Sequence, residues 1–266
     1  MILTRLRKFS EKLAQPRQIH TTIHLTHAKA GSTWLDRIFR QLLGPLVAPR
    51  GYTAAREVGF DTSKYVFPPG RFYSAMFLSY EEFLAHPELE HARRFVVLRD
   101  PRDTVVSNYF SLKVSHPPDE KGQVAPLRSA LEGMNEEEGM LFCMSKMRPL
   151  GPRQLAWWRS GELIYKYEDL IRDDITLLSD LILDQLKLPL SSKRVRKVIL
   201  ENQFEARFKR PLGTVDVNSH GRVGAPGNWR KHFTPPVAAE FIEHFGDALL
   251  AGGYEKDHGW VSTLKS

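Results

Sequence analysis

The sequence lacks several features that define whole classes of protein. It has one cysteine in 266 residues, Cys143, which excludes an internal disulfide framework and a cysteine-rich zinc site. No apolar run approaches the ~20 residues that a transmembrane helix needs. The first residues also lack the apolar core of about 7–15 residues that a secretory signal carries. We therefore expect no membrane-spanning segment and, by default, a cytoplasmic, reducing setting.

The composition is that of a globular protein with an excess of positive charge. Apolar residues make up 42% and charged residues 26% of a chain without internal repeats or low-complexity tracts. The 38 Lys and Arg residues exceed the 31 Asp and Glu residues, which gives a formal charge of +7. Such a charge favours an anionic partner: a nucleotide, a sulfated or phosphorylated ligand, nucleic acid or an acidic membrane.

The domain organisation follows from length and pattern. Residues 19–266 fit one large α/β domain. Residues 1–18 form a separate basic segment, in which Ile2, Leu6, Phe9 and Leu13 recur at helical intervals. Such a helix either lies on a membrane surface or, as the simpler interpretation, packs on its own domain or frays.

Strand and helix patterns alternate along the domain. We predict strands at Ile19–Thr26, Arg94–Leu98 and Leu163–Tyr167, because these runs are apolar or alternate with period two. Helices are predicted at Trp34–Leu43, from Pro101 to about Leu112 behind an Asp100 cap, from the third strand to about Leu188, at Ser191–Leu200 and at Val237–Leu250. This alternation predicts a parallel sheet covered by helices on both faces.

Two segments do not fit that alternation. Pro45–Arg71 and Ser111–Pro152 are rich in Pro, Gly or charge, and we expect irregular lids there, around a site at the carboxyl ends of the strands. The aromatic and Met residues within Gly51–Phe72 and Lys113–Pro152 suit an apolar or amphipathic ligand, although core packing explains them equally well.

The segment after the first strand has the composition of an anion-binding loop. In Lys29-Ala-Gly-Ser-Thr-Trp, Gly31 permits a tight turn, and successive N–H groups at a helix start can hold a phosphate or sulfate. The order differs from a Walker A loop, in which the Lys follows the second Gly. A tight turn with a solvated Lys29 remains the alternative for this segment alone.

Two further segments carry cations beside turn or helix residues. Arg99 ends the second strand, where it either holds a phosphate through two nitrogens or pairs with Asp100 or Asp103. The segment Gly221–Arg230 combines three further glycines with Arg222, which suits a loop that closes over an anion or, alternatively, a flexible loop with solvated charge.

Taken together, these segments resemble the sulfotransferases that use 3′-phosphoadenosine-5′-phosphosulfate (PAPS) as donor. The matches, in chain order, are Lys29–Trp34 to the family's K-S-G-T-T-W loop, Arg99 and Ser107 to its 3′-phosphate motif, Tyr167–Leu170 to Y-E-D-[LM], Asn202–Phe204 to T-S-F, and Arg222–Trp229 to R-K-G-x-x-G-D-W. They extend from residue 19 to about residue 254. Five matches in order are far more specific than one.

The resemblance implies a single α/β domain with a P-loop-like central parallel sheet, and a role for each matching residue. Lys29 would contact the bridging oxygen of the phosphosulfate and stabilise the leaving phosphate. The residues implied in cofactor binding are Lys29, Ala30, Gly31, Ser32 and Thr33 at the 5′-phosphate, Arg99, Ser107, Arg222, Val223 and Gly224 around the 3′-phosphate, and Trp34, Tyr167 and Phe204 around the adenine. No metal is implied.

The sequence departs from the family pattern at the catalytic base. Many members carry a His about 22 residues before the motif Arg, where this chain has Phe77. Relatives that act on glycans or protein tyrosines use a Glu after the first helix, and Glu57 is the nearest equivalent. His27 and His116 are further candidates, and a solvated Glu57 paired with Arg56 is the simpler interpretation of that residue.

Two smaller departures concern the cofactor and the oligomer. Val223 stands where the family has a second cation beside Arg222, which predicts weaker 3′-phosphate binding. Pro235 and Pro236 follow Thr234, where the family's dimer segment has T-V. The oligomeric state therefore stays open.

The leading hypothesis is an enzyme that transfers a sulfuryl group from PAPS to a hydroxyl or amine acceptor and releases 3′-phosphoadenosine 5′-phosphate (PAP). The acceptor is a small molecule, lipid or glycan that the sequence does not identify. The alternative is a catalytically impaired protein that binds PAPS or PAP. A nucleic-acid-binding domain and a kinase are disfavoured, because no nucleic-acid motif and no Walker A order are present.

Overall fold

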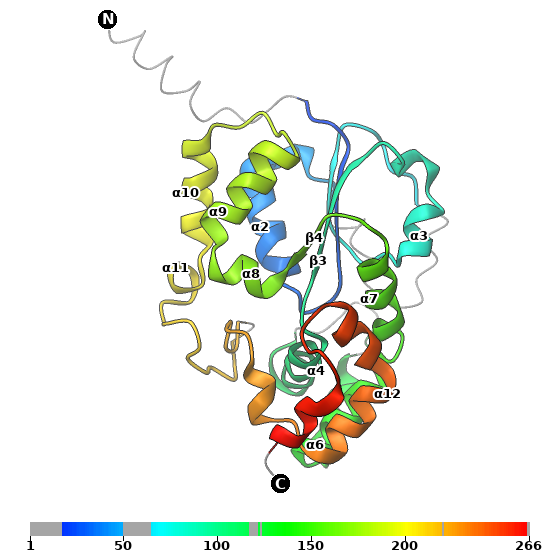
Figure 1. Ribbon diagram of the computed structural model, residues 1–266. Helices are drawn as coiled ribbons and strands as arrows, with labels where there is room; N and C mark the ends of the chain where they lie inside the picture. The colour runs from blue at the N-terminus through cyan, green and yellow to red at the C-terminus, as the bar shows by residue number, and fades with distance from the viewer. Residues whose placement is uncertain (1–17, 50–64, 117–121, 123, 220, 265–266) are drawn as a thin grey trace, which may run out of the picture.

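A parallel four-stranded sheet forms the centre of the protein (Figure 1). The computed structural model describes residues 18–49, 65–116, 122, 124–219 and 221–264. The strands lie in the order β2-β1-β3-β4, and every neighbouring pair is parallel. Their bounds are Thr22–Thr26 for β1, Phe72–Met76 for β2, Arg93–Leu98 for β3 and Ile164–Lys166 for β4. All four carboxyl ends therefore meet at one edge of the sheet.

Three of these strands confirm the sequence prediction with slightly different bounds, and β2 was not predicted. Successive side chains of a strand point to opposite faces. In β3, Phe95 and Val97 join the apolar cluster on one face of the sheet, whereas Val96 and Leu98 join the cluster on the other. This division explains the nearly continuous apolar run, because both faces are covered.

Helices cover both faces of the sheet, as predicted. One face packs against α2 (Ser32–Leu43), α8 (Tyr167–Arg172), α9 (Asp174–Asp180) and α10 (Ser192–Asn202). The other packs against α3 (Tyr80–Leu84) and α7 (Leu150–Arg159). Short connections are the 3₁₀ turns Gly44–Leu46 and Pro87–Leu89, and helix α11 (Phe204–Phe208).

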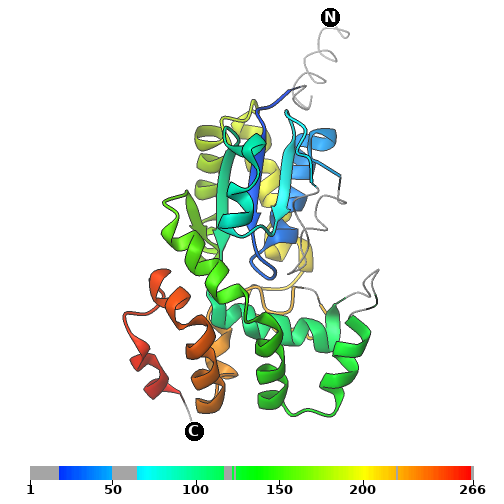
Figure 2. The same ribbon diagram turned by 90° about the vertical axis from the view of Figure 1, so that its right-hand side faces the viewer.

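A third apolar cluster lies beyond the carboxyl edge of the sheet, among helices (Figure 2). Its elements are α4 (Pro101–Phe110), α5 (Val124–Glu132), α6 (Glu136–Met147), α12 (Pro235–Ala251) and the 3₁₀ turns Asn228–Lys231 and His258–Thr263. The expectation of an irregular segment at Ser111–Pro152 is therefore wrong, because α5, α6 and the start of α7 occupy most of it. Asn135 and Glu138 form a capping box that begins α6, and Pro149 directly precedes α7.

Helix ends refine two other predictions. Asp100 caps α4 with Pro101 in its first turn, as expected, but from Ser111 to Ser115 the helix continues as a π-helix. The single helix predicted to about Leu188 breaks at Asp173, whose side chain caps α9, and α9 ends in a second π-helical turn, Leu181–Gln185. The predicted helices α10 and α12 are present with slightly longer bounds.

Of the remaining sequence predictions, some concern residues that the structure describes and some do not. Among the described residues, no helix is both long and apolar enough to cross a membrane. Cys143 is buried in α6, where burial raises the pKa of its thiol to about 12. The basic segment up to Arg17 and the candidate base Glu57 lie outside the described residues.

Candidate functional site

A cavity of about 880 Å³ opens where the carboxyl ends of the strands face the helical layer. Residues from all five motif segments line it. They are Lys29, Gly31, Ser32, Thr33, Trp34, Arg99, Ser107, Asn202, Tyr167, Phe204, Arg222, Val223 and Gly224. Ala30 is not among the lining residues, because its side chain is fully buried behind the loop. The sheet thus brings together residues that lie up to 195 positions apart, from Lys29 to Gly224.

The loop between β1 and α2 presents a helix N-terminus to this cavity. Lys29 and Gly31 both have positive φ, at 69° and 79°, and Gly31 is the N-cap of α2. A Cβ on Gly31 would lie 2.9 Å from the ring of Tyr167, so glycine is required there by contact as well as by conformation. Among the described residues, no side chain caps this N-terminus. The first N–H groups of α2 are consequently suited to binding an anion.

Lys29 carries a charge whose proton is held less firmly than usual. Burial, and to a smaller extent repulsion from Arg99, lower the pKa of its ammonium from 10.5 to about 8. The two residues are linked directly, because Arg99 Nη1 donates a hydrogen bond to the Lys29 carbonyl at 2.9 Å. An anion in the cavity would favour the charged form and raise this pKa.

Arg99 follows β3, and its guanidinium contacts several groups of the protein while one of its nitrogens has no partner among the described residues. Its guanidinium lies 4.6 Å from the centre of the Tyr167 ring, and its Nη2 lies 3.9 Å from the Asp103 carboxylate. Its Nε is buried and has no hydrogen-bond partner among the described residues. Buried donors are almost always satisfied. The side chain therefore keeps one donor for a ligand.

Asp103 joins the segment 222–229 to α4. Its carboxylate is 2% exposed and accepts hydrogen bonds from the backbone N–H groups of Gly227 at 2.6 Å and Trp229 at 3.0 Å. Sequence reasoning considered Asp103 only as a partner of Arg99. Its main role is to accept from backbone N–H groups of the glycine-rich segment. The sequence indicated this role only indirectly, because the N–H groups of such a segment need acceptors.

The segment that Asp103 holds covers the cavity with Arg222 and Gly224. The Arg222 guanidinium lies 3.8 Å from the centre of the Phe110 ring, and burial lowers its pKa. The Tyr167 hydroxyl donates to the Gly224 carbonyl at 3.1 Å. A Cβ on Gly224 would lie 2.5 Å from the Phe204 ring, and the residue has a φ of 72°. Tyr167 and Phe204 are thereby packed against the two glycine turns.

Glu168 supports this arrangement from behind the cavity. Its carboxylate accepts from the Asp100 backbone N–H and from the Tyr254 hydroxyl, both at 3.0 Å. Burial raises the pKa of Glu168, although the hydrogen bond from Asp100 opposes the shift. This residue of the matched Tyr167–Leu170 segment therefore braces the start of α4 rather than facing the cavity.

The structure separates the candidates for a general base. Phe77, at the family's His position, does line the cavity, directly after β2. His27 does not: its Nδ1 binds the Ala28 carbonyl, and its Nε2 lies 2.7 Å from Gln154 Nε2 and accepts from the Arg99 N–H. Burial lowers the pKa of His27 to about 4. Both ring nitrogens are thus engaged, and His27 serves as a structural link.

His116 lines the cavity together with the π-helical turn that precedes it. Ser111 and Ser115 of that turn also face the cavity, and the buried Ser111 Oγ has no hydrogen-bond partner among the described residues. π-helical turns are frequent at functional sites. This part of the cavity carries no cofactor motif.

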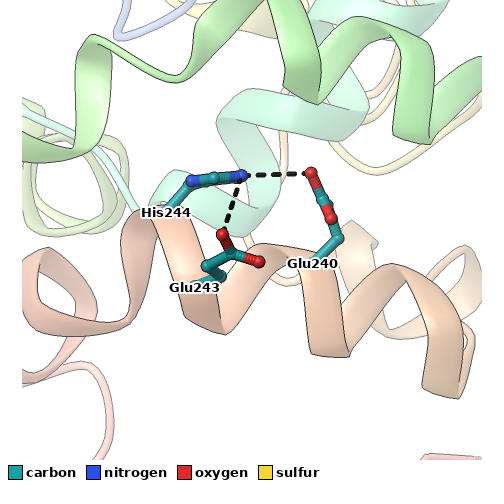
Figure 3. Close-up of side chains that lie close together, drawn as sticks. All are labelled: Glu240, Glu243 and His244. Carbon is teal, nitrogen blue, oxygen red and sulfur yellow. Dashed lines mark hydrogen bonds and ion pairs between the residues drawn. The ribbon is translucent and has the colours of Figure 1, made fainter.

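One other cluster of ionisable groups lies apart from the cavity. Glu240, Glu243 and His244 project from α12 (Figure 3), and none of them lines the cavity. Arg148 donates to Glu240 at 3.0 Å and, together with His244, lowers the pKa of that carboxyl. The Glu240 charge is therefore already paired within the chain.

Comparisons with known proteins identify the family and the fold. A family model described as the sulfotransferase domain matches residues 78–253. The solved structure of mouse sulfotransferase SULT7A1 complexed with PAP is similar at a TM-score of 0.50 and 17% identity, covering 91% of this chain and 88% of that chain. Retinol dehydratase in complex with androsterone and the inactive cofactor PAP gives a TM-score of 0.45 and 13% identity, with coverages of 92% and 84%. No curated protein matches the chain.

Proposed function

Because the chain belongs to the sulfotransferase domain family, we propose that it transfers a sulfuryl group from PAPS to a hydroxyl or amine of an acceptor and releases PAP. One observation carries the proposal. Cations and hydrogen-bond donors from five separate segments line a single cavity, and among them the buried Nε of Arg99 has no partner within the described residues. A ligand with several anionic groups supplies what these donors lack.

The residues fit the two anionic ends of PAPS. In the proposed arrangement the uncapped N-terminus of α2, with Gly31, Ser32 and Thr33, holds the 5′-phosphosulfate. Arg99, Ser107, Arg222 and Gly224 hold the 3′-phosphate. Trp34, Tyr167 and Phe204 frame the adenine. The sheet order supports this placement, since the cavity runs from Phe77 after β2, past Lys29 after β1, to Tyr167 after β4.

Lys29 acts on the bond that breaks. In the transfer, a lone pair of the acceptor oxygen or nitrogen forms a bond to sulfur, and the bond from sulfur to the 5′-phosphate oxygen breaks with its electron pair. Negative charge then grows on the phosphate that leaves, and a prearranged ammonium stabilises it most at that point. The acceptor proton goes to a base or to water.

Few residues are candidates for the general base that removes the acceptor proton. His27 is removed by its two internal hydrogen bonds. His116, which lines the cavity, and Glu57, which lies outside the described residues, remain. A base contributes about 10²–10⁴-fold in rate. Phe77 at the family's His position therefore favours a second candidate function, a protein that binds PAPS or PAP and turns over slowly or not at all.

The proposed acceptor follows from the lining residues outside the matched cofactor positions. Among these, Phe77 and Val106 are apolar, whereas Ser111, Ser115 and His116 offer polar groups. We propose an amphipathic small-molecule acceptor.

Calorimetric titration with PAP tests the proposal, with ATP as the control. We expect PAP to bind at least about tenfold more tightly than ATP, because ATP lacks a 3′-phosphate. Transfer of label from ³⁵S-PAPS to a panel of phenols, alcohols and amines then separates the two candidate functions. PAP binding without transfer supports the binding protein, and absence of PAP binding contradicts both.

A further inference from the structure

Two asparagines line the cavity, and their side chains are in opposite states. Asn202 Nδ2 donates to Gln41 Oε1 at 2.6 Å and to the Val198 carbonyl at 2.8 Å. Asn228 Nδ2 is buried and has no hydrogen-bond partner among the described residues. The amide of Asn202 is therefore used to hold α10 to α2, whereas the Nδ2 of Asn228, a residue that lines the cavity, has no internal partner among the described residues.

The backbone on either side of Asn228 is fixed, so its side chain is not simply part of a loose loop. Gly227 and Trp229 donate their N–H groups to the two oxygens of Asp103, at 2.6 Å and 3.0 Å. The oxygen that accepts from Gly227 also lies 3.9 Å from Arg99 Nη2. The backbone N–H of Gly227, the residue before Asn228, and the guanidinium of Arg99 are thus both near the same carboxylate oxygen of Asp103.

Two buried donors, Arg99 Nε and Asn228 Nδ2, therefore lack acceptors among the described residues, and both belong to residues that line the cavity. A buried donor that stays unpaired destabilises the protein, because it has lost its hydrogen bond to water and gained none in return. Because both groups donate, a ligand that satisfies them must present acceptor atoms, and the nearby positive charges of Arg99 and Arg222 select an anion. A phosphate, with several oxygens, meets this requirement.

We propose that the Asn228 side-chain amide is a further ligand of the 3′-phosphate, in addition to Arg99, Ser107 and Arg222. The inference rests on the proposed function, because it assumes that PAP occupies this cavity. Asp103 acts as a positioning residue for it, since its carboxylate fixes the backbone on both sides of Asn228 and does not contact the ligand in this arrangement.

The proposal also accounts for two departures from the family pattern together. Where that pattern has a cation and an aspartate, this chain has Val223 and Asn228. One positive and one negative charge disappear, so the net charge of the segment is unchanged. The donor that Val223 cannot supply is supplied by Asn228.

Titration of PAP and of 5′-AMP, which lacks the 3′-phosphate, tests the assignment on the full chain. A hydrogen bond to a charged group contributes about 1.5–3 kcal/mol, so Asn228→Ala should weaken PAP binding about tenfold to a hundredfold. Its affinity for 5′-AMP should stay within about twofold. Asn228→Asp should bind PAP more weakly still, because a carboxylate repels the phosphate, although aspartate is the residue of the family pattern.

Thermal melting without ligand separates this role from a structural one. Asn228→Ala should melt at or above the wild-type temperature, because it removes an unsatisfied buried donor. The matched control Asn202→Ala should melt at a lower temperature, because it breaks two hydrogen bonds.

Three results overturn the inference while the proposed function stands: unchanged PAP affinity in Asn228→Ala, equal losses for PAP and 5′-AMP, or tighter PAP binding by Asn228→Asp than by Asn228→Ala. Failure of the wild-type protein to bind PAP overturns the proposed function and this inference with it.

Discussion

The carboxyl ends of β1 and β3 both present positive charge to the same cavity, but they are built differently. The β1 end has one lysine, Lys29, and burial is the main reason that its pKa is lowered to about 8. It precedes a helix N-terminus that no side chain of the described residues caps. The β3 end has the guanidiniums of Arg99 and Arg222, whose segments are joined by the buried carboxylate of Asp103.

The difference separates two electrostatic tasks. An arginine remains charged at any ordinary pH and suits a group that stays anionic throughout, such as a 3′-phosphate. A lysine with a lowered pKa responds to its surroundings, and its charge is stabilised as negative charge grows beside it. We therefore assign catalysis chiefly to the β1 end and ground-state binding chiefly to the β3 end.

Removing the lysine charge is expected to have the largest effect. Lys29→Ala should lower the turnover of labelled PAPS about 10²–10³-fold, because a donor aimed at developing charge is lost. PAP affinity should fall by less than about tenfold. Lys113→Ala is the matched control, because Lys113 binds the Tyr109 hydroxyl and does not line the cavity. A loss confined to affinity in Lys29→Ala would contradict the division between the two ends.

Removing the arginine charge should affect binding first. Arg99→Ala should weaken PAP binding about a hundredfold in calorimetry, since bonds to charged groups contribute about 1.5–3 kcal/mol each. Arg94→Ala provides the comparison at the opposite end of β3, where Arg94 pairs with Glu162. Circular dichroism confirms that each variant is folded. Equal affinity losses in Arg99→Ala and Lys29→Ala would remove the distinction.

The pH dependence of PAP affinity probes the β1 end alone. With PAP absent, Lys29 titrates at about 8, and a bound anion raises this pKa. The protonated form binds more tightly, so affinity should be nearly constant well below pH 8 and fall above it, by less than about tenfold in total, which is the loss expected for Lys29→Ala. Lys29→Met should abolish the decline. Titrations between pH 6.5 and 9.5 measure this, and a decline that persists in the variant would assign it elsewhere.

The strands, and the segments after them that line the cavity, were far easier to predict from the sequence than the helical layer. β3 contains an apolar run, β1 alternates apolar and polar residues, and the anion-binding segments follow strands whose carboxyl ends must meet at one edge. β2 was missed because Phe72–Met76 has all five residues buried and follows a segment rich in Gly and Pro, so it shows no alternation.

The helices of Ser111–Pro152 were missed for a different reason. Pro and Gly there indicated irregular structure, yet Pro126 and Pro152 lie in the first turns of α5 and α7, where proline is tolerated. The capping box of Asn135 and Glu138 was the available signal. The internal roles of Asp103 and His27 depend on partners far away in the chain, such as Trp229 and Gln154, which no local pattern reveals.

The smallest expected change in PAP affinity comes from Val223→Lys, which adds a flexible cation near the two arginines, Arg99 and Arg222. Val223 lines the cavity at 9% exposure, and its carbonyl accepts from the Gly213 N–H at 2.9 Å, so the backbone bond survives substitution. Val223→Lys should tighten PAP binding about two- to fivefold, the range of a partly solvated ion pair, and the gain should shrink as salt rises. The unliganded variant should melt at a lower temperature, because an ammonium replaces a buried apolar side chain.

If Asn228 already supplies the missing donor, Val223→Lys should increase PAP affinity more in the Asn228→Ala background than in the wild type. An identical gain in both backgrounds would mean that the two side chains act on separate parts of the ligand.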